Sequence, residues 1–270
     1  PAVADALMEQ YLPRFAGDAI PATDTGATLA LADRLDTLVG IFSIGQQPSG
    51  SRDPFALRRA SLGILRIIIE RNIDLDLKLA ITAAAEQLNI SEDVDTLCLQ
   101  VLTYILERFK AWYRDEGIDA EVFASVAALA LSNPLDIDVR VKAVDQFTRL
   151  PEAVALAAAN KRVFNILAKQ AADTVPAAID SSLLVDAAEQ QLAESISALS
   201  STIAPLLEQR DYAGVLKELA SLRGPVDQFF DDVMVMVDDP AIRDNRLALL
   251  NSLRSLFLNV ADISQLVVSK

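Results

Sequence analysis

Residues 229–239 read FFDDVMVMVDD and residues 245–264 read NRLALLNSLRSLFLNVADIS, and these two stretches decide the fold class of the chain. Asp239 followed by Pro240 is an N-cap residue followed by proline at the first helical position, the preferred start of a helix. The stretches predict a buried helical hairpin with Phe229, Phe230, Met234 and Met236 mostly in the core. The apolar stripe of the last helix has the three- or four-residue spacing of one helix face; it consists of Leu249, Leu253, Leu256, Val260 and Ile263.

The same helical spacing recurs through nearly all of the 270 residues, of which 52% are hydrophobic and only 9 are glycine. This composition favours an all-α fold built of helical bundles. Asp53-Pro54 repeats the capping device, and Gly117 suits the residue just after a helix. We expect two domains, residues 1–150 and 151–270. The predicted helices are 29–42, 54–72, 76–89, 92–115, 118–131, 136–149, 152–172, 183–209, 213–237 and 240–267, with a loop at 171–182.

Several classes of protein are excluded or disfavoured by composition. The sequence contains no histidine, which excludes a Ser-His-Asp triad, a Cys-His pair and a histidine metal site within these residues. The only cysteine, Cys98, lies in an apolar run and is expected to be a buried thiol. No apolar run is long enough to span a membrane, and no signal peptide is visible. We therefore expect a cytoplasmic piece of a longer protein.

The most suggestive basic motif lies at residues 160–169, NKRVFNILAK. The apolar residues of this predicted helix face inward, and its other faces carry amide and cationic side chains that suit phosphate groups or base edges. An ordinary surface helix is the alternative. The net charge of −14 opposes binding to a polyanion at face value, but local patches decide which partners bind. The candidate RNA contacts here are Asn160, Lys161, Arg162, Asn165 and Lys169.

Other arginines extend this hypothesis. Arg243 and Arg254 are eleven residues apart, three helical turns, so they align along one edge of the last helix, and Arg246 flanks its apolar stripe. Arg58 and Arg59 lie early in the predicted helix that follows Asp53. Arginine binds phosphate bidentately, but the alternative in each case is an ion pair with one of the many acidic side chains.

Two further groups have mainly structural interpretations. Basic residues at 108, 110 and 114 lie beside Trp112 and Tyr113, and we favour core aromatics with a charged rim over a clamp for nucleic acid. Asp33 and Asp36 are three residues apart on one predicted helix, where paired carboxylates can bind metal, although a salt-bridged helix edge is the simpler interpretation.

Several stretches taken together, in order and over essentially the whole chain, resemble the β subunit of bacterial glycyl-tRNA synthetase, of the type with two α and two β subunits. No single stretch is decisive, but the ordered set is specific. The stretches are residues 11–18, 32–42, 44–46, 53–59, 65–68, 111–117, 159–163 and 165–167, besides the two quoted first.

The resemblance implies the C-terminal portion of that subunit: the end of an HD-like helical domain, a helical middle region, and a DALR-like anticodon-binding helical bundle at 151–270. It implies a ligase subunit that binds tRNA-Gly so that the α subunit can charge it with glycine. ATP and Mg²⁺ would act at the α subunit, and no cofactor or catalytic residue is expected in this portion. The implied partners are tRNA-Gly and the α subunit, without a membrane.

Two other hypotheses remain. One is a non-catalytic acidic scaffold that docks protein partners, which would explain the net charge directly. The other is a metal-dependent phosphohydrolase, because residues 32–35 also resemble the last helix of the His-Asp phosphohydrolase fold, with Asp33 at the final metal-ligand position. The histidine ligands of that fold are missing from these residues, so a working phosphohydrolase confined to them is excluded.

Overall fold

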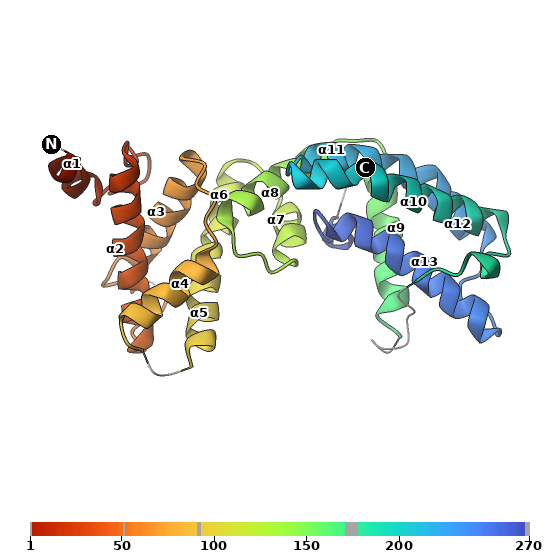
Figure 1. Cartoon of the computed structure of the whole chain (residues 1–270), viewed down its shortest axis with the longest axis horizontal. Coiled ribbons are helices and arrows are strands. Elements are labelled where there is room, and N and C mark those ends of the chain that lie inside the picture. The colour runs from red at the N-terminus through yellow and green to blue at the C-terminus, as the bar shows by residue number, and fades with distance from the viewer. Residues whose placement is uncertain (1, 51, 91–92, 171–177, 268–270) are drawn as a thin grey trace. The chain divides into compact units, whose positions relative to one another are not determined.

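The computed structural model describes residues 2–50, 52–90, 93–170 and 178–267, and within these ranges the chain is built of helices (Figure 1). No β-strand forms in the described ranges; the backbone pairs only in an isolated antiparallel bridge between Ser49 and Arg52. The predicted all-α fold is confirmed. No described helix is both long and apolar enough to cross a membrane.

The chain divides into two compact units, Pro1–Gly117 with Leu131–Asp138, and Ile118–Ala130 with Val139–Lys270. Helix α8 (Pro134–Thr148) therefore begins in the first unit and continues in the second. The compact units do not have the bounds of the predicted domains 1–150 and 151–270, and that division of the sequence stays a prediction.

Helices α1 to α6 belong to the first unit, and α2, α3, α4 and α5 share one core. Apolar residues of α2 and α3, such as Leu38 and Ile64, are fully buried in it, and Cys98 of α5 is buried as expected. Buried Arg34 of α2 donates hydrogen bonds to the backbone oxygens of Gln10, Leu12 and Ala30 at 2.8–2.9 Å. The helices are α1 (Ala2–Glu9), α2 (Asp24–Ser43), α3 (Leu57–Glu70), α4 (Leu77–Gln87), α5 (Val94–Leu106) and α6 (Arg108–Asp115).

Two predicted helices of this unit differ in detail. The Asp53 carboxylate caps a helix, accepting hydrogen bonds from the amides of Leu57 and Arg58 at 2.8 and 3.0 Å. That helix starts only at Leu57, because Ala56 has a left-handed backbone conformation with φ of 55°. The helix predicted at 92–115 is interrupted at Glu107 and forms α5 and α6. Gly117 follows α6 with φ of +78°, as its predicted role requires.

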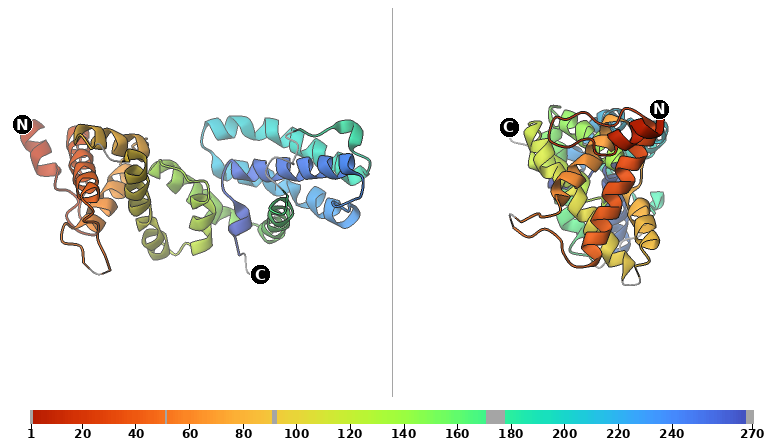
Figure 2. Two further views of the ribbon diagram at one scale, coloured as in Figure 1. Left: turned by 90° about the horizontal axis from the view of Figure 1, so that it is seen from below. Right: turned by 90° about the vertical axis from the view of Figure 1, so that its left-hand side faces the viewer.

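In the second unit, α10 contacts α11, α12 and α13, while α9 contacts α12 and α13. Figure 2 (left) shows α10 and α13 lying lengthwise side by side, with α9 seen nearly end-on. The core includes Leu192 of α10, Phe229 of α12 and Leu253 of α13. The elements are α7 (Ala120–Ala127), α9 (Ala153–Leu167), α10 (Ala187–Glu208), α11 (Tyr212–Leu219), α12 (Arg223–Asp232) and α13 (Pro240–Leu258), with 3₁₀ turns η1 (Ser181–Leu183), η2 (Ala220–Leu222) and η3 (Ile263–Gln265).

The stretch quoted first folds partly as predicted. Asp239 caps α13, accepting hydrogen bonds from the amides of Ala241 and Ile242 at 2.9 and 3.3 Å. Residues 233–239, however, are not helical, and burial alternates from residue 233 to residue 236. Val233 and Val235 are buried, whereas Met234 and Met236 are 73% and 51% exposed. The prediction that both methionines lie in the core is therefore wrong. Part of the predicted loop at 171–182, residues 171–177, lies outside the described residues.

Candidate nucleic-acid interface

The exposed face of α9 carries four of the predicted contacts. Val163 is buried and anchors the helix, while Lys161, Arg162, Asn165 and Lys169 are exposed, the last of these just beyond the end of the helix. The apolar back and polar front expected from the sequence are therefore present. This face offers cationic and amide donors to an incoming ligand.

Aromatic rings lie under these cations. The guanidinium carbon of Arg162 is 4.1 Å from the ring centroid of Phe230 on α12, and the Lys161 ammonium is 5.6 Å from the ring of Phe164. Arg254 of α13 lies over the same Phe164 ring at 5.0 Å. Three helices therefore combine their cations and aromatic rings on one side of the unit, and cation–π contacts hold the cations in place without neutralising them.

The aromatic rings of Phe164 and Phe230 were not among the predicted contacts. Phe230 was assigned to the core, but it is half-buried and stacks under Arg162. Phe164 follows the basic pair 161–162 by two residues, and this closeness of basic and aromatic residues was the available signal. The contact with Phe230 gave no such signal, because it joins α9 to α12 across about seventy residues of sequence.

The predicted arginines of α13 differ from one another. Arg254 donates to the Asp262 carboxylate at 3.2 Å, and its Nε is buried without a hydrogen-bond partner among the described residues. Arg243, three turns earlier, is half-buried beside the Asp244 carboxylate at 3.3 Å. Both guanidinium groups already have a carboxylate neighbour, so they offer a polyanion less than Arg162 does.

Asn160 and Arg246 are buried and do not lie on the exposed surface. Asn160 is 2% exposed and donates to the backbone oxygen of Leu156 at 3.0 Å. The Arg246 side chain is 6% exposed and forms ion pairs with Glu189 and, at 2.7 Å, with Asp186. It also donates to the Met234 oxygen at 2.7 Å. Neither side chain has a surface to offer RNA, and we do not retain them as contacts. Helical position alone did not separate these inward-facing polar groups from the exposed ones.

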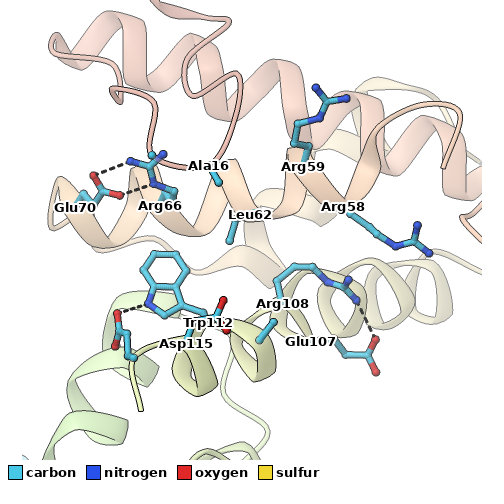
Figure 3. A pocket seen from close by; sticks show the side chains of 13 residues that line it. Ala16, Arg58, Arg59, Leu62, Arg66, Glu70, Glu107, Arg108, Trp112 and Asp115 are labelled. Carbon is cyan, nitrogen blue, oxygen red and sulfur yellow. Dashed lines mark hydrogen bonds and ion pairs between the residues drawn. The ribbon is translucent and has the colours of Figure 1, made fainter. Parts of the chain in front are cut away.

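Arg58 and Arg59 belong to the first unit, where they line a cleft of about 560 Å³ between α3 and α6 (Figure 3). Arg59 is exposed, and the Arg58 side chain donates to the Gly50 oxygen. The structure therefore places these two in a different unit from the α9 face. Trp112 of α6 also lines this cleft and is half-buried, while neighbouring Tyr113 is buried in the core as expected.

Two ionisable groups with clearly shifted pKa values lie in the first unit. The hydroxyl of Tyr113 donates to Asp138 at 3.1 Å, and burial raises the pKa of Tyr113 well above its usual value. Hydrogen bonds from Arg14 lower the pKa of Asp18 to about 2. Asp33 and Asp36 of α2 are both exposed, and the described residues contain no group of three acidic, cysteine or histidine side chains able to hold a metal ion.

An all-helical unit with a cationic, aromatic-edged helix face has the features expected of a helical nucleic-acid-binding domain. Comparison with family models gives this class a more specific description. Residues 156–264 match the model of the DALR anticodon binding domain, and residues 1–128 match the model of the glycyl-tRNA synthetase beta subunit.

Full-chain comparisons agree with both matches. The chain is 57% identical over 264 residues to the glycine–tRNA ligase beta subunit of Marinobacter nauticus and 58% identical to that of Pseudomonas aeruginosa. It is 54% identical to the corresponding subunit of Chromohalobacter salexigens. Each alignment covers 98% of this chain and 38% of the relative. The chain therefore belongs to the glycyl-tRNA synthetase beta subunit family, and it spans well under half the length of these relatives.

Proposed function

We propose that this chain is the tRNA-recognition part of a cytoplasmic glycine–tRNA ligase β subunit. In this proposal it binds tRNA-Gly, and the α subunit charges the tRNA with glycine, using ATP and Mg²⁺ bound at the α subunit. The observation that carries the proposal is the α9 face, which lies within the region that matches an anticodon-binding domain and presents cations stacked on aromatic rings.

The contacts that we propose are the accessible ones. Lys161, Arg162, Asn165 and Lys169 are exposed, and Phe230 and Phe164 hold two of the cations in place. Arg254 and Arg243 are secondary contacts because each has a carboxylate neighbour. Cationic groups would bind phosphate oxygens, and the Asn165 amide could meet a base edge.

A binding titration tests this proposal. The chain is titrated onto labelled tRNA-Gly and onto a second tRNA at about 50 and 200 mM salt, because phosphate contacts make affinity fall steeply with salt. We expect tighter binding to tRNA-Gly at both salt concentrations. Equal binding to both tRNAs would contradict specific recognition. No binding at either salt concentration would contradict tRNA recognition by this chain and would favour the acidic scaffold instead.

A further inference from the structure

The cleft between α3 and α6 of the first unit has an apolar interior. Figure 3 shows Leu62 of α3 facing Trp112 of α6 across it, with Ala16 close to Leu62. Its volume of about 560 Å³ lies within the range of pockets that hold small organic ligands. The interior therefore suits a flat apolar group more than an ion.

The indole of Trp112 is held in one orientation. Its Nε1 donates to the Glu116 carboxylate at 2.5 Å, and Phe109 packs against it with ring centroids 6.2 Å apart. The side chain is only half-buried, so part of the ring stays open to the cleft. A fixed and partly open indole is a stacking surface, since every nucleobase has an aromatic face that can lie on it.

The charges on the rim of the cleft are unequally paired. Its four carboxylates each have a partner: Glu70 pairs with Arg66, Glu107 with Arg108, Asp115 with Arg114, and Glu116 with the Trp112 indole. Two of the four lining arginines, Arg58 and Arg59, have no carboxylate partner among the described residues. Figure 3 shows both at the end of the cleft away from Glu70, with the Arg59 guanidinium pointing away from α6. That end therefore keeps uncompensated positive charge.

Arg66, the third lining arginine, is used within the fold. Arg66 uses Nε for Glu70 at 2.6 Å and Nη2 for the Asp18 oxygen at 2.8 Å, while its Nη1 is buried without a hydrogen-bond partner among the described residues. Because this nitrogen is covered by protein atoms, it is not open to a ligand in the cleft, and Arg66 serves mainly the fold.

We propose that this cleft binds one unpaired nucleotide of an RNA, with its base between Leu62 and Trp112 and its phosphate at Arg58. Exposed Arg59 adds positive charge beside this site. The proposal rests on the proposed function for its partner, an RNA. A purely apolar ligand would leave the two arginines without an anion, and an anion alone would leave the indole unused. The base and phosphate of a nucleotide satisfy both.

Intrinsic fluorescence tests the site directly, because Trp112 is the only tryptophan of the 270 residues. The chain is titrated with a short single-stranded oligoadenylate, with free AMP and with inorganic phosphate. We expect the oligoadenylate to quench Trp112, AMP to do so only at higher concentration, and phosphate to leave it unchanged. Quenching by AMP without quenching by RNA would assign the cleft to free nucleotides and overturn the RNA proposal. No quenching by either would overturn the site altogether.

Variants of the lining residues test whether the quenching of Trp112 arises from binding in the cleft. Replacing both Arg58 and Arg59 by glutamine should raise the oligoadenylate concentration for half-quenching about tenfold, since the phosphate contact at Arg58 and the neighbouring positive charge are lost. Lys78→Gln is the control, because Lys78 is an exposed cation of the first unit, on α4, and does not line the cleft. Ala111→Glu is a second variant, which places a carboxylate in the cleft from an exposed helix position. Unchanged quenching in both cleft variants would overturn the proposal.

The outcome is separable from that of the proposed function. Arg162→Gln lies in the second unit and should leave the quenching of Trp112 by oligoadenylate unchanged. A chain that fails to select tRNA-Gly but shows quenching that depends on Arg58 and Arg59 would lose the proposed function and keep the nucleotide site. Selective tRNA binding without quenching would keep the function and remove the site.

Discussion

The buried side of α13 around Arg246 and the exposed face of α9 around Arg162 lie in one compact unit and carry the same kind of side chain. Arg246 is surrounded by Glu189, Asp186 and the Met234 oxygen, so its charge is used within the fold. Arg162 is exposed and rests on Phe230, so its charge stays available. The partner of an arginine, more than its presence in a motif, therefore separates a structural role from a binding role.

The strongest test of this comparison removes Arg246. Arg246→Met leaves the fully buried Glu189 carboxylate without its cation and releases the segment at Met234, so we expect a loss of about 3–5 kcal/mol in the free energy of unfolding. Urea unfolding followed by circular dichroism measures it. Arg243→Met, on the same helix but partly exposed, is the control and should cost under about 1 kcal/mol. Equal effects of the two variants would contradict the assigned structural role.

The same logic applies to Arg34 in the first unit. Arg34→Met removes the donors for the backbone oxygens of Gln10 and Leu12 and should cost about 2–3 kcal/mol in the free energy of unfolding. Unfolding followed by Trp112 fluorescence reports on this unit. Exposed Arg14, which pairs with Asp18, is the comparison, and Arg14→Met should have a smaller effect. The distinction between buried and exposed arginines would not hold if the order were reversed.

On the α9 face the expected change is in binding and not in folding. Arg162→Gln should weaken binding of tRNA-Gly roughly five- to tenfold and reduce the slope of log affinity against log salt by about one, because one phosphate contact is lost. Gel-shift titration at several salt concentrations measures both quantities. Arg149→Gln, another exposed arginine of the second unit, is the control. A tRNA affinity that is unchanged in Arg162→Gln would remove this residue from the interface.

Protonation of Asp18 at low pH is expected to have a smaller effect, on the free energy of unfolding. Hydrogen bonds from Arg14 lower the pKa of Asp18 to about 2, below the value of about 3.9 in an unfolded chain. The carboxylate therefore contributes stability above pH 4, and this contribution is lost as the pH falls towards 2. The difference in unfolding free energy between the parent and Asp18→Asn should shrink over that interval. A difference independent of pH would contradict the assigned interaction.

The smallest effect is expected at Met234. Its side chain is exposed while its backbone oxygen accepts from Arg246, so Met234→Ser should change the free energy of unfolding by less than about 0.5 kcal/mol. Thermal unfolding measures it, and Val235→Ser at the neighbouring buried position should be clearly destabilising. A large effect of Met234→Ser would indicate that the side chain is covered in solution.

Much of the fold was predictable because helices follow local rules. Apolar spacing located the helices, and Asp53, Asp239 and Gly117 marked helix ends in the described structure. Residues 233–237 show the limit of this reasoning. Apolar residues at every position were compatible with a buried helix, but the segment is not helical. Val233 and Val235 are buried, and Met234 and Met236 are exposed. The candidate site was predictable as a basic helix, while the burial of Asn160 and Arg246 was not.

The sequence by itself determined the helical fold class, the family and the position of the basic helix at 160–169, because spacing, capping and residue order are properties of the chain. Only the tertiary structure decided which charges remain free. Glu189 lies 57 residues from Arg246, and Phe230 lies 68 residues from Arg162, so neither contact can be predicted from local sequence. Burial and ion pairing depend on which helices pack together, and this packing left Arg162 and Arg59 accessible while it enclosed Arg246 and Arg34.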